Sequence, residues 1–437
     1  MDNTLTIVRK GSLYEDLVLR FLTRMDKGQM ELELPGGGRM VIGDDGANGD
    51  RGKMASRMNG DGGAMMGSRV NGNGRACIRI LDMEFYRRCV LYGDIGFGEA
   101  YVDGLWDTDD ITAVIGWFLL NIDNAPGVSG NKTQALALNI LKWWNRRVHS
   151  KRANTLRGSR RNISNHYDLS NDFFRLFLDE TMTYSSAYFE REGMGLEEAQ
   201  FAKYERLCRQ LRLSPADHVL EIGSGWGANA VYMAKHYGCR VTSLTISEEQ
   251  HRLATERVKQ EGLEDRVEIR LEDYRQLTGK FDKIVSVEML EAVGHHYLDI
   301  YFKKCHDLLK RDGILALQVI TCPDSRYEDL RNGVDWIQKH IFPGSLLPSV
   351  GAINAAINRT GEMTMVDLKD LGLHYASTLR AWFAQFNSRL AEVKALGFDE
   401  RFVRKWNYYL CYCEAAFLMR NIHVMQLVYT RPNNTGR

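Results

Sequence analysis

The clearest pattern in the sequence is an alternation of short apolar runs and amphipathic segments that begins near Asn165. Short apolar runs fit strands buried on both faces, and the segments between them repeat their apolar residues with helical spacing. The predicted elements are strand 219–222, helix 228–237, strand 240–245, helix 248–261, strand 267–270, strand 283–287, helix 297–309 and strand 314–320. This order predicts a doubly wound α/β sheet that binds ligands at the carboxyl ends of its strands.

Residues 326–415 are predicted to be largely helical, and the apolar segment 422–429 is predicted to close the sheet. The helical region is rich in large apolar side chains, namely Trp336, Ile341, Phe342, Trp382, Phe383, Phe386, Trp406, Tyr408 and Tyr409. Two interpretations stay open. These side chains either form a lid over an apolar substrate or make an ordinary aromatic core.

Ahead of the sheet, the pattern predicts a small α+β lobe with helix 13–25, strand-like 29–42, strand 76–81 and helix 83–92. Residues 43–75 interrupt this lobe with Gly, Asn, Asp, Met and Ser and show no hydrophobic periodicity. Such a composition cannot bury enough apolar surface to offset the entropy of ordering. We therefore expect a disordered insertion.

Three alternating glycines, Gly223, Gly225 and Gly227, follow the first predicted strand of the sheet in the sequence VLEIGSGWG. Glycine lets the chain turn with positive φ and lie against a ligand at the start of the next helix. The pattern also fits nicotinamide dinucleotide sites, but the ribose-binding carboxylate expected there is missing from residues 240–245. The motif therefore favours S-adenosylmethionine (SAM), and the alternative is a turn that binds nothing.

Composition narrows the classes of function. The chain of 437 residues is long enough for two lobes, and its 57 Lys and Arg against 56 Asp and Glu give no overall charge for binding nucleic acid. Eight scattered cysteines lack zinc-like spacing, so we expect reduced cytosolic thiols and no metal site. The start of the chain lacks the apolar centre of a signal peptide, and no uncharged run is long enough to span a bilayer. Any membrane contact is expected to be peripheral.

Residues 139–161 carry a local cluster of positive charge without any acid. The basic residues stand beside Trp143 and Trp144 and comprise Lys142, Arg146, Arg147, Lys151, Arg152, Arg157, Arg160 and Arg161. Basic side chains favour anionic lipid surfaces, and tryptophan favours the membrane interface. The alternative is a solvated helix between the lobes with its tryptophans packed inward.

Five motifs stand in a specific order: residues 92–106 read YGDIGFGEAYVDGLW, 165–174 read NHYDLSNDFF, 182–188 read MTYSSAY, 220–227 read LEIGSGWG and 287–294 read VEMLEAVG. Together they resemble the cyclopropane-fatty-acyl-phospholipid synthases and their relatives, the mycolic acid cyclopropane synthases. The resemblance covers nearly the whole chain. It implies a family-specific, lipid-binding α+β domain at 1–138, a basic linker at 139–164, and at 165–437 a Rossmann-like class I SAM-dependent methyltransferase sheet with a helical lid.

The resemblance implies an enzyme that transfers the SAM methyl as a methylene across a cis double bond of an unsaturated phospholipid acyl chain, forming a cyclopropane fatty acid. It further implies a homodimer in the cytoplasm, associated peripherally with the inner face of the membrane. The nearest alternative is a methyl-branched or methylene product. More distant ones are a small-molecule N-methyltransferase, against which residues 92–106 argue, and a catalytically silent lipid-binding protein, against which the intact glycines argue.

By resemblance, SAM contacts Tyr167, Ser185, Gly223, Gly225, Gly227, Thr245, Gln250, Glu272 and Asp273. Thr245 and Gln250 offer neutral donors and acceptors where a dehydrogenase places an acid. A carboxylate at Asp273, just beyond the third strand, can accept the adenine amino protons. The alternative for Glu272 and Asp273, taken without the resemblance, is a solvated strand end.

Methyl transfer to an alkene leaves a carbocation, and a proton must leave the new methyl group before a ring can close. By resemblance the base is a bicarbonate ion bound by Glu291, the backbone near Ser186 and Ile320, Gln318 and Tyr375. Ser186 and Gln318 depart from the best-known bacterial synthases, which carry Cys and His there. Residues 318–320, together with 323–327 and 341–344, resemble the plant-type branch. Without the resemblance, Glu291 could be an acid at a helix start.

Overall fold

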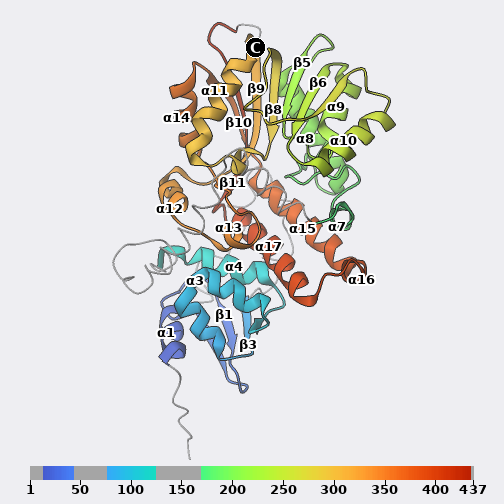
Figure 1. Ribbon diagram of the computed structural model, residues 1–437. Helices are drawn as coiled ribbons and strands as arrows, with labels where there is room; N and C mark the ends of the chain where they lie inside the picture. The colour runs from blue at the N-terminus through green and yellow to red at the C-terminus, as the bar shows by residue number, and fades with distance from the viewer. Residues whose placement is uncertain (1–12, 44–75, 125–168, 435–437) are drawn as a thin grey trace, which may run out of the picture. The chain divides into compact units, whose positions relative to one another are not determined.

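The computed structural model describes residues 13–43, 76–124 and 169–434, which belong to two compact units (Figure 1). The first unit comprises Met1–Leu141 and Glu400–Tyr408, and the second comprises Lys142–Asp399 and Tyr409–Arg437. The predicted insertion, the basic segment and the predicted domain boundaries near 138 and 164 lie outside the described residues. The sequence does not predict that residues 400–408 belong with the first unit.

The first unit is a small α+β fold built on a four-stranded sheet of order β2-β1-β3-β4. Strands β1 and β2 form an antiparallel hairpin, β3 runs parallel to β1, and β4 runs antiparallel to β3. The elements are α1 (Leu13–Leu22), β1 (Met30–Glu33), β2 (Arg39–Ile42), β3 (Ala76–Ile80), α3 (Glu84–Val102), β4 (Trp106–Asp107), α4 (Ile111–Leu120) and the 3₁₀ helix η2 (Ile122–Asn124). The predicted α+β lobe is thus present.

The motif at residues 92–106 shapes this unit through its glycines. Gly93 has φ 58° and ψ −133°, which is not helical, so α3 consists of two helical segments that meet at a kink there, and the first ends at residue 92 as the sequence predicts. A Cβ on Gly96 would lie 2.2 Å from the carbonyl oxygen of Arg88, so only glycine fits there. At the end of the motif, Trp106 is fully buried and donates its indole N–H to the Phe97 carbonyl at 2.9 Å. The motif therefore contributes to the packing of the first unit.

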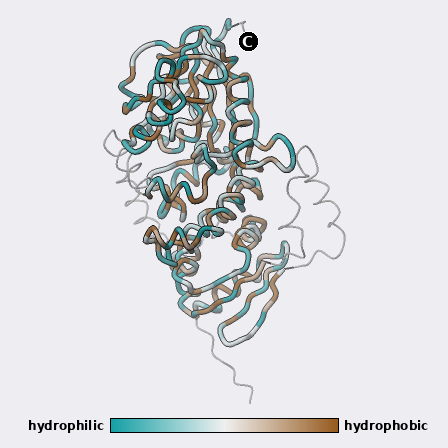
Figure 2. Tube along the Cα trace, turned by 90° about the vertical axis from the view of Figure 1, so that its right-hand side faces the viewer, coloured by the Kyte–Doolittle hydropathy of each residue, from teal (hydrophilic) through white to brown (hydrophobic). Residues whose placement is uncertain are grey.

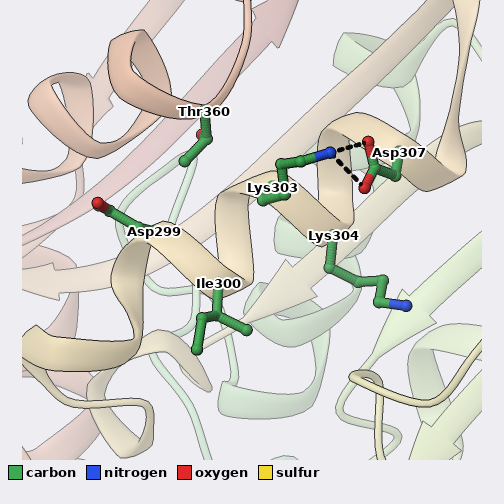
Figure 3. A pocket seen from close by; sticks show the side chains of 6 residues that line it. All are labelled: Asp299, Ile300, Lys303, Lys304, Asp307 and Thr360. Atoms are coloured by element: carbon green, nitrogen blue, oxygen red, sulfur yellow. Dashed lines mark hydrogen bonds and ion pairs between the residues drawn. The ribbon is translucent and has the colours of Figure 1, made fainter.

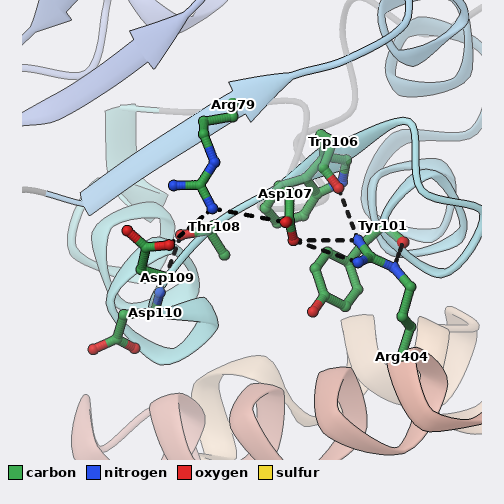
Figure 4. A network of polar contacts seen from close by, with 8 residues as sticks. All are labelled: Arg79, Tyr101, Trp106, Asp107, Thr108, Asp109, Asp110 and Arg404. Carbon is green, nitrogen blue, oxygen red and sulfur yellow. Dashed lines mark hydrogen bonds and ion pairs between the residues drawn. The ribbon is translucent and has the colours of Figure 1, made fainter. Parts of the chain in front are cut away.

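An arginine from α17 (Glu400–Leu418) completes the first unit (Figure 4). The Arg404 guanidinium donates to the carbonyl oxygens of Tyr101 at 2.7 Å and Trp106 at 2.9 Å. It also pairs with Asp107 at 3.4 Å and lies 4.0 Å from the centre of the Tyr101 ring. These contacts join residues some 300 positions apart in the sequence.

The second unit is built on a seven-stranded sheet of order β10-β11-β9-β8-β5-β6-β7. The neighbours from β9 to β7 are parallel, whereas β11 runs antiparallel to both β9 and β10. The strands are β5 (His218–Ile222), β6 (Arg240–Thr245), β7 (Val267–Leu271), β8 (Phe281–Val287), β9 (Leu309–Thr321), β10 (Thr364–Asp370) and β11 (His423–Thr430). The predicted doubly wound sheet is confirmed.

Helices cover both faces of this sheet (Figure 1), with α11 and α14 on one face and α8, α9 and α10 on the other. Alternate strand residues supply the two cores: Leu220 and Leu315 pack with the first pair of helices, and Val219 and Ile314 pack with the other three. Figure 2 shows hydrophobic and hydrophilic residues interspersed along the helices, which pack one face against the sheet. The helices are α7 (Asn171–Arg175), α8 (Leu196–Leu211), α9 (Ala228–Tyr237), α10 (Glu248–Gln260), α11 (Leu298–Leu308), α12 (Tyr327–Asn332), α13 (Trp336–His340), α14 (Val350–Thr360), α15 (Gly372–Ser388) and α16 (Leu390–Ala395), with 3₁₀ turns η3 (Leu290–Ala292), η4 (His295–Tyr297) and η5 (Asp324–Arg326).

One prediction about the C-terminal part is wrong. Residues 364–370, assigned to a largely helical region, form strand β10 at the edge of the sheet, and β11 lies inside it between β9 and β10. None of the residues of β10 is fully buried, and three of them are charged. An exposed edge strand needs no apolar run, so hydrophobic pattern alone does not reveal it.

Among the described helices, none is both long and apolar enough to cross a membrane.

Arg404→Ala should lower the free energy of unfolding by about 1–3 kcal/mol, because two carbonyl oxygens and a carboxylate lose a charged donor. Urea unfolding measures the change. Arg401→Ala is the matched control. Arg401 lies on the same helix as Arg404 and pairs with Asp103, but it is 66% exposed and should contribute less than about 1 kcal/mol. Equal losses in the two variants would contradict the role given to Arg404.

Candidate active site

The turn from β5 to α9 carries the three glycines in conformations that favour glycine. Gly223, Gly225 and Gly227 have φ values of 101°, 49° and 86°. The N–H groups of Gly223 and Ser224 donate to the Leu244 carbonyl at 3.0 and 2.8 Å, which ties the turn to β6. A Cβ added to Gly227 would press on Ala254 at 3.0 Å, whereas one added to Gly225 would meet no atom within 4 Å. Gly225 is therefore the position where a ligand can approach the backbone.

A carboxylate that the sequence analysis did not select lies directly below this turn. Glu221 is buried on β5 and accepts hydrogen bonds from Asn229 at 2.7 Å and from the hydroxyl of Ser243. Burial raises its pKa to about 7, and the two hydrogen bonds work in the opposite direction. The sequence feature that could have identified Glu221 is an acidic residue among the apolar residues of β5. Glu221 holds the ends of three neighbouring elements together.

The residues predicted to hold adenosine gather beyond β6. Thr245 donates its hydroxyl to the side-chain oxygen of Gln250 at 2.9 Å, and the N–H of Glu272 donates to the Thr245 carbonyl at 3.0 Å. Asp273 is buried, but its two oxygens accept from Arg275 at 2.9 and 2.6 Å. The structure thus links Thr245, Gln250 and Glu272 at the end of β6. It also gives Asp273 an arginine partner, Arg275, that the sequence did not indicate. Tyr167 lies outside the described residues.

Ser185 contacts a lysine that the sequence analysis missed. Lys203, on α8, is completely buried and donates its ammonium to the Ser185 hydroxyl at 2.8 Å. Burial lowers the pKa of Lys203 to about 7, although nearby Glu288, Asp179 and Glu221 favour its charged form. From the sequence alone, a lysine on a helix is expected to be exposed to solvent, so only the structure shows that Lys203 is buried.

Ser186, Gln318 and Tyr375 converge on a carboxylate, and that carboxylate belongs to Glu288. The Ser186 N–H and the Gln318 side-chain amide both donate to Glu288 Oε1 at 2.8 Å. Tyr375, buried on α15, makes a further hydrogen bond that lowers the pKa of Glu288. Three segments far apart in the sequence therefore form one anion site around Glu288.

Glu291, the carboxylate selected from the sequence, takes a neighbouring position. The N–H of Ile320 donates to its Oε1, and its buried Oε2 has no hydrogen-bond partner within the described part of the chain. Burial, together with the charge of Glu288, raises the pKa of Glu291 to about 8. The two carboxylates influence each other: the charge of Glu288 favours the protonated form of Glu291, whereas the donors around Glu288 favour its charged form.

Glu288 also has an unusual backbone. Its φ is 48°, in the left-handed region that costs a residue with a side chain about 1–2 kcal/mol. The N–H of Glu288 donates to the Gln318 carbonyl at 2.7 Å and extends the pairing of β8 with β9 by one residue. Strained residues of this kind cluster at functional sites because the surrounding structure must hold them in place.

Comparison with known proteins assigns this chain to a family. The family model described as mycolic acid cyclopropane synthetase matches residues 154–427. The chain belongs to this family. It is 41% identical to the tuberculostearic acid methyltransferase UfaA1 of Mycobacterium tuberculosis, over 79% of this chain and 81% of that protein. It is 38% identical to the cyclopropane-fatty-acyl-phospholipid synthase of Escherichia coli, over 83% of this chain and 89% of that protein.

A solved structure of the family agrees. The mycolic acid cyclopropane synthase CmaA1, complexed with SAH and CTAB, matches 62% of this chain and 98% of its own with a TM-score of 0.58 and 33% identity. The family resemblance and the class I methyltransferase fold that the sequence predicts are both confirmed. The roles predicted for individual site residues stay predictions.

The residues present do not fit a bound bicarbonate ion in the arrangement described. The Ser186 N–H, the Gln318 amide and Tyr375 are engaged by Glu288, and the Ile320 N–H is engaged by Glu291. Every donor that the resemblance assigns to bicarbonate is thus already bound by a carboxylate of this chain. A second anion would need these donors and would face the charge of Glu288.

Neither a metal site nor a second ligand site is found among the described residues. The described residues contain no group of three or more His, Cys, Asp or Glu that could hold a metal ion. A surface pocket on α11 is lined by Asp299, Ile300, Lys303, Lys304, Asp307 and Thr360 (Figure 3). Lys303 points to Asp307 and binds both carboxylate oxygens at 2.7 Å, so these exposed charges already satisfy each other.

Gly225→Val should weaken SAM binding at least about tenfold, because the new side chain fills the open space against which a ligand would lie. Calorimetric titration measures the affinity. Gly262→Val is the matched control: Gly262 also has positive φ (64°) and open space at the Cβ position, but it lies in the turn after α10. Both variants should lose similar stability, and only Gly225→Val should lose affinity. Wild-type affinity in a folded Gly225→Val protein would remove the turn from the SAM site.

Glu291→Gln should remove a pH-dependent loss of stability. The folded pKa of Glu291, about 8, lies above its ordinary value of 4.5, so folding favours the protonated form. The stability that this proton provides is present below pH 4.5 and is lost as the pH rises through 8. Urea unfolding should show the variant gaining on wild type by up to about 1.4 kcal/mol per pH unit across this range. Glu264→Gln, at an exposed position, controls for net charge. Parallel stability curves for wild type and Glu291→Gln would show that Glu291 is ionised throughout.

Proposed function

We propose that this chain transfers the methyl group of SAM to a cis double bond in an unsaturated phospholipid acyl chain and closes the product to a cyclopropane ring. The match to the cyclopropane-fatty-acyl-phospholipid synthase of E. coli carries the proposal. That match extends over 362 residues. Because the segment 142–437 is shorter than this, the match includes part of the first unit. The mycolic acid synthase structure covers only 62% of the chain.

The interior of the second unit suits a reaction that passes through a carbocation. The rings of Tyr184 and Tyr375 lie 5.2 and 5.9 Å from that of Trp382, and Tyr375 also bonds the Glu288 carboxylate. Aromatic faces attract positive charge, and a buried apolar site keeps water from capturing the cation. A carboxylate beside these rings can accept the proton that ring closure releases.

A second candidate product is a methyl-branched or methylene acyl chain. The protein that supports it, at 41% identity, is named a tuberculostearic acid methyltransferase. Both reactions share the methyl transfer and the cation, and they differ in what the cation does next. The Ser186 and Gln318 departures fall at the anion site, which is where that fate would be decided.

We extend the proposal to the membrane surface, where phospholipid acyl chains reside. Its support is the acid-free basic segment 139–161 with Trp143 and Trp144. A peripheral location at the inner face of the membrane and a homodimeric state complete the proposal.

Lipids extracted from a bacterium that expresses the protein should show the product directly. A cyclopropane ring adds one CH₂ to the mass and removes the olefinic proton signals. A methylene branch adds the same mass but keeps olefinic protons, and a saturated methyl branch carries two further hydrogens. Mass spectrometry with proton NMR separates the three. Lipids unchanged from those of cells with an empty vector, despite folded and SAM-binding protein, would refute both candidate functions.

A further inference from the structure

The position of Glu288 places its carboxylate next to the predicted SAM turn. Glu288 directly follows β8, whose neighbour in the parallel sheet is β5, the strand that leads into the glycine turn. The next residue, Met289, lies against that turn, since its side chain would be 3.4 Å from a Cβ on Gly223. Ser286 adds a hydrogen bond to the carbonyl oxygen of Ile222 at 2.8 Å. The turn that carries Glu288 and the turn that carries the glycines are therefore packed together.

The donors around Glu288 are fixed in orientation by their own partners. Gln426 donates to the side-chain oxygen of Gln318 at 2.9 Å, which leaves the Gln318 NH₂ group to point at Glu288 and at the Ser186 carbonyl. Ser186 is itself fully buried. An amide turned the other way would place oxygen against oxygen at both sites. The site is thus built to receive a negative charge at one position.

The carboxylate of Glu288 supplies the negative charge that these donors bind. Glu288 accepts the Ser186 and Gln318 hydrogen bonds at 2.8 Å, and Lys203, buried nearby, adds a favourable positive charge. Glu291 removes the remaining backbone donor by binding the Ile320 N–H. Burial raises the pKa of Glu288 above its ordinary value, which makes its carboxylate a stronger base than one in water.

We propose that the Glu288 carboxylate is a built-in replacement for the bicarbonate ion that the family resemblance assigns to this site, and that it serves as the base of the reaction. The inference rests on the proposed function. The residue that accepts the Ser186 and Gln318 hydrogen bonds is also the one with the left-handed backbone.

The proposed steps balance. The π electrons of the double bond form a C–C bond to the SAM methyl as the S–C bond breaks, with its electron pair left on sulfur, which gives S-adenosylhomocysteine and a carbocation. A C–H bond of the transferred methyl then breaks. Its electron pair forms the second C–C bond of the ring, and its proton moves to a Glu288 oxygen and from there to solvent. No oxidant or reductant is needed.

The test compares wild type with Glu288→Gly and Glu288→Gln in buffer freed of carbon dioxide. Glycine removes the carboxylate, accepts the left-handed backbone without strain and leaves the three donors open. Glutamine keeps the shape and fills the site but cannot take a proton. Wild type should be active without bicarbonate. Both variants should lose about 10²-fold or more in turnover, and added bicarbonate should restore only Glu288→Gly.

A binding measurement makes the test independent of the lipid substrate. ¹³C NMR of labelled bicarbonate should show binding to Glu288→Gly but none to wild type or Glu288→Gln, with SAM affinity and urea unfolding reported for all three. Wild-type activity that requires bicarbonate, full activity of Glu288→Gln, or equal bicarbonate binding by wild type and Glu288→Gly would each overturn the inference. A wild type that yields no methylated lipid would refute the proposed function instead, and the bicarbonate binding comparison would still decide whether Glu288 fills the anion site.

Discussion

The candidate active site depends on two carboxylates in a single turn after β8, of which Glu291 is buried and Glu288 is half-buried. Glu288 and Glu291 are three positions apart, and the charge of Glu288 adds to burial in raising the pKa of Glu291. The donors decide how they differ. Ser186, Gln318 and Tyr375 stabilise a charge on Glu288, whereas Glu291 receives one backbone N–H and leaves its other oxygen without a partner in the described structure. One turn therefore presents two acids whose surroundings favour opposite protonation states.

The sheet supplies the rigidity that this arrangement needs. β8 and β9 are central parallel strands, and their ends bring Glu288 and Gln318 together without any loop to adjust. β11 holds the amide of Gln318 in one orientation through Gln426. A second polar layer, formed by Lys203 and Glu221, lies close enough for its charges to influence the first. Because each group is fixed by another, the left-handed backbone of Glu288 is maintained at a cost that the fold absorbs.

The sequence predicted the elements and the glycine turn correctly where a residue type has a single structural role. The strands and helices around the glycine turn fall within a few residues of their predicted limits, because apolar runs and helical spacing report burial directly. The glycines at 223, 225 and 227 were found for a similar reason, since positive φ restricts the choice of residue. Edge strand β10 escaped prediction because an exposed strand carries no apolar signal.

The sequence by itself determined the α/β sheet, the separate α+β lobe and the family, and it predicted the segments of the candidate site. Only the tertiary structure decided which carboxylate those segments surround. Glu288 and Glu291 are the same residue type in the same motif, and sequence spacing does not tell which of them meets Ser186 from one segment, Gln318 from another and Tyr375 from a third. Protonation follows those distant contacts, since a buried acid takes its charge from the donors that the fold delivers to it.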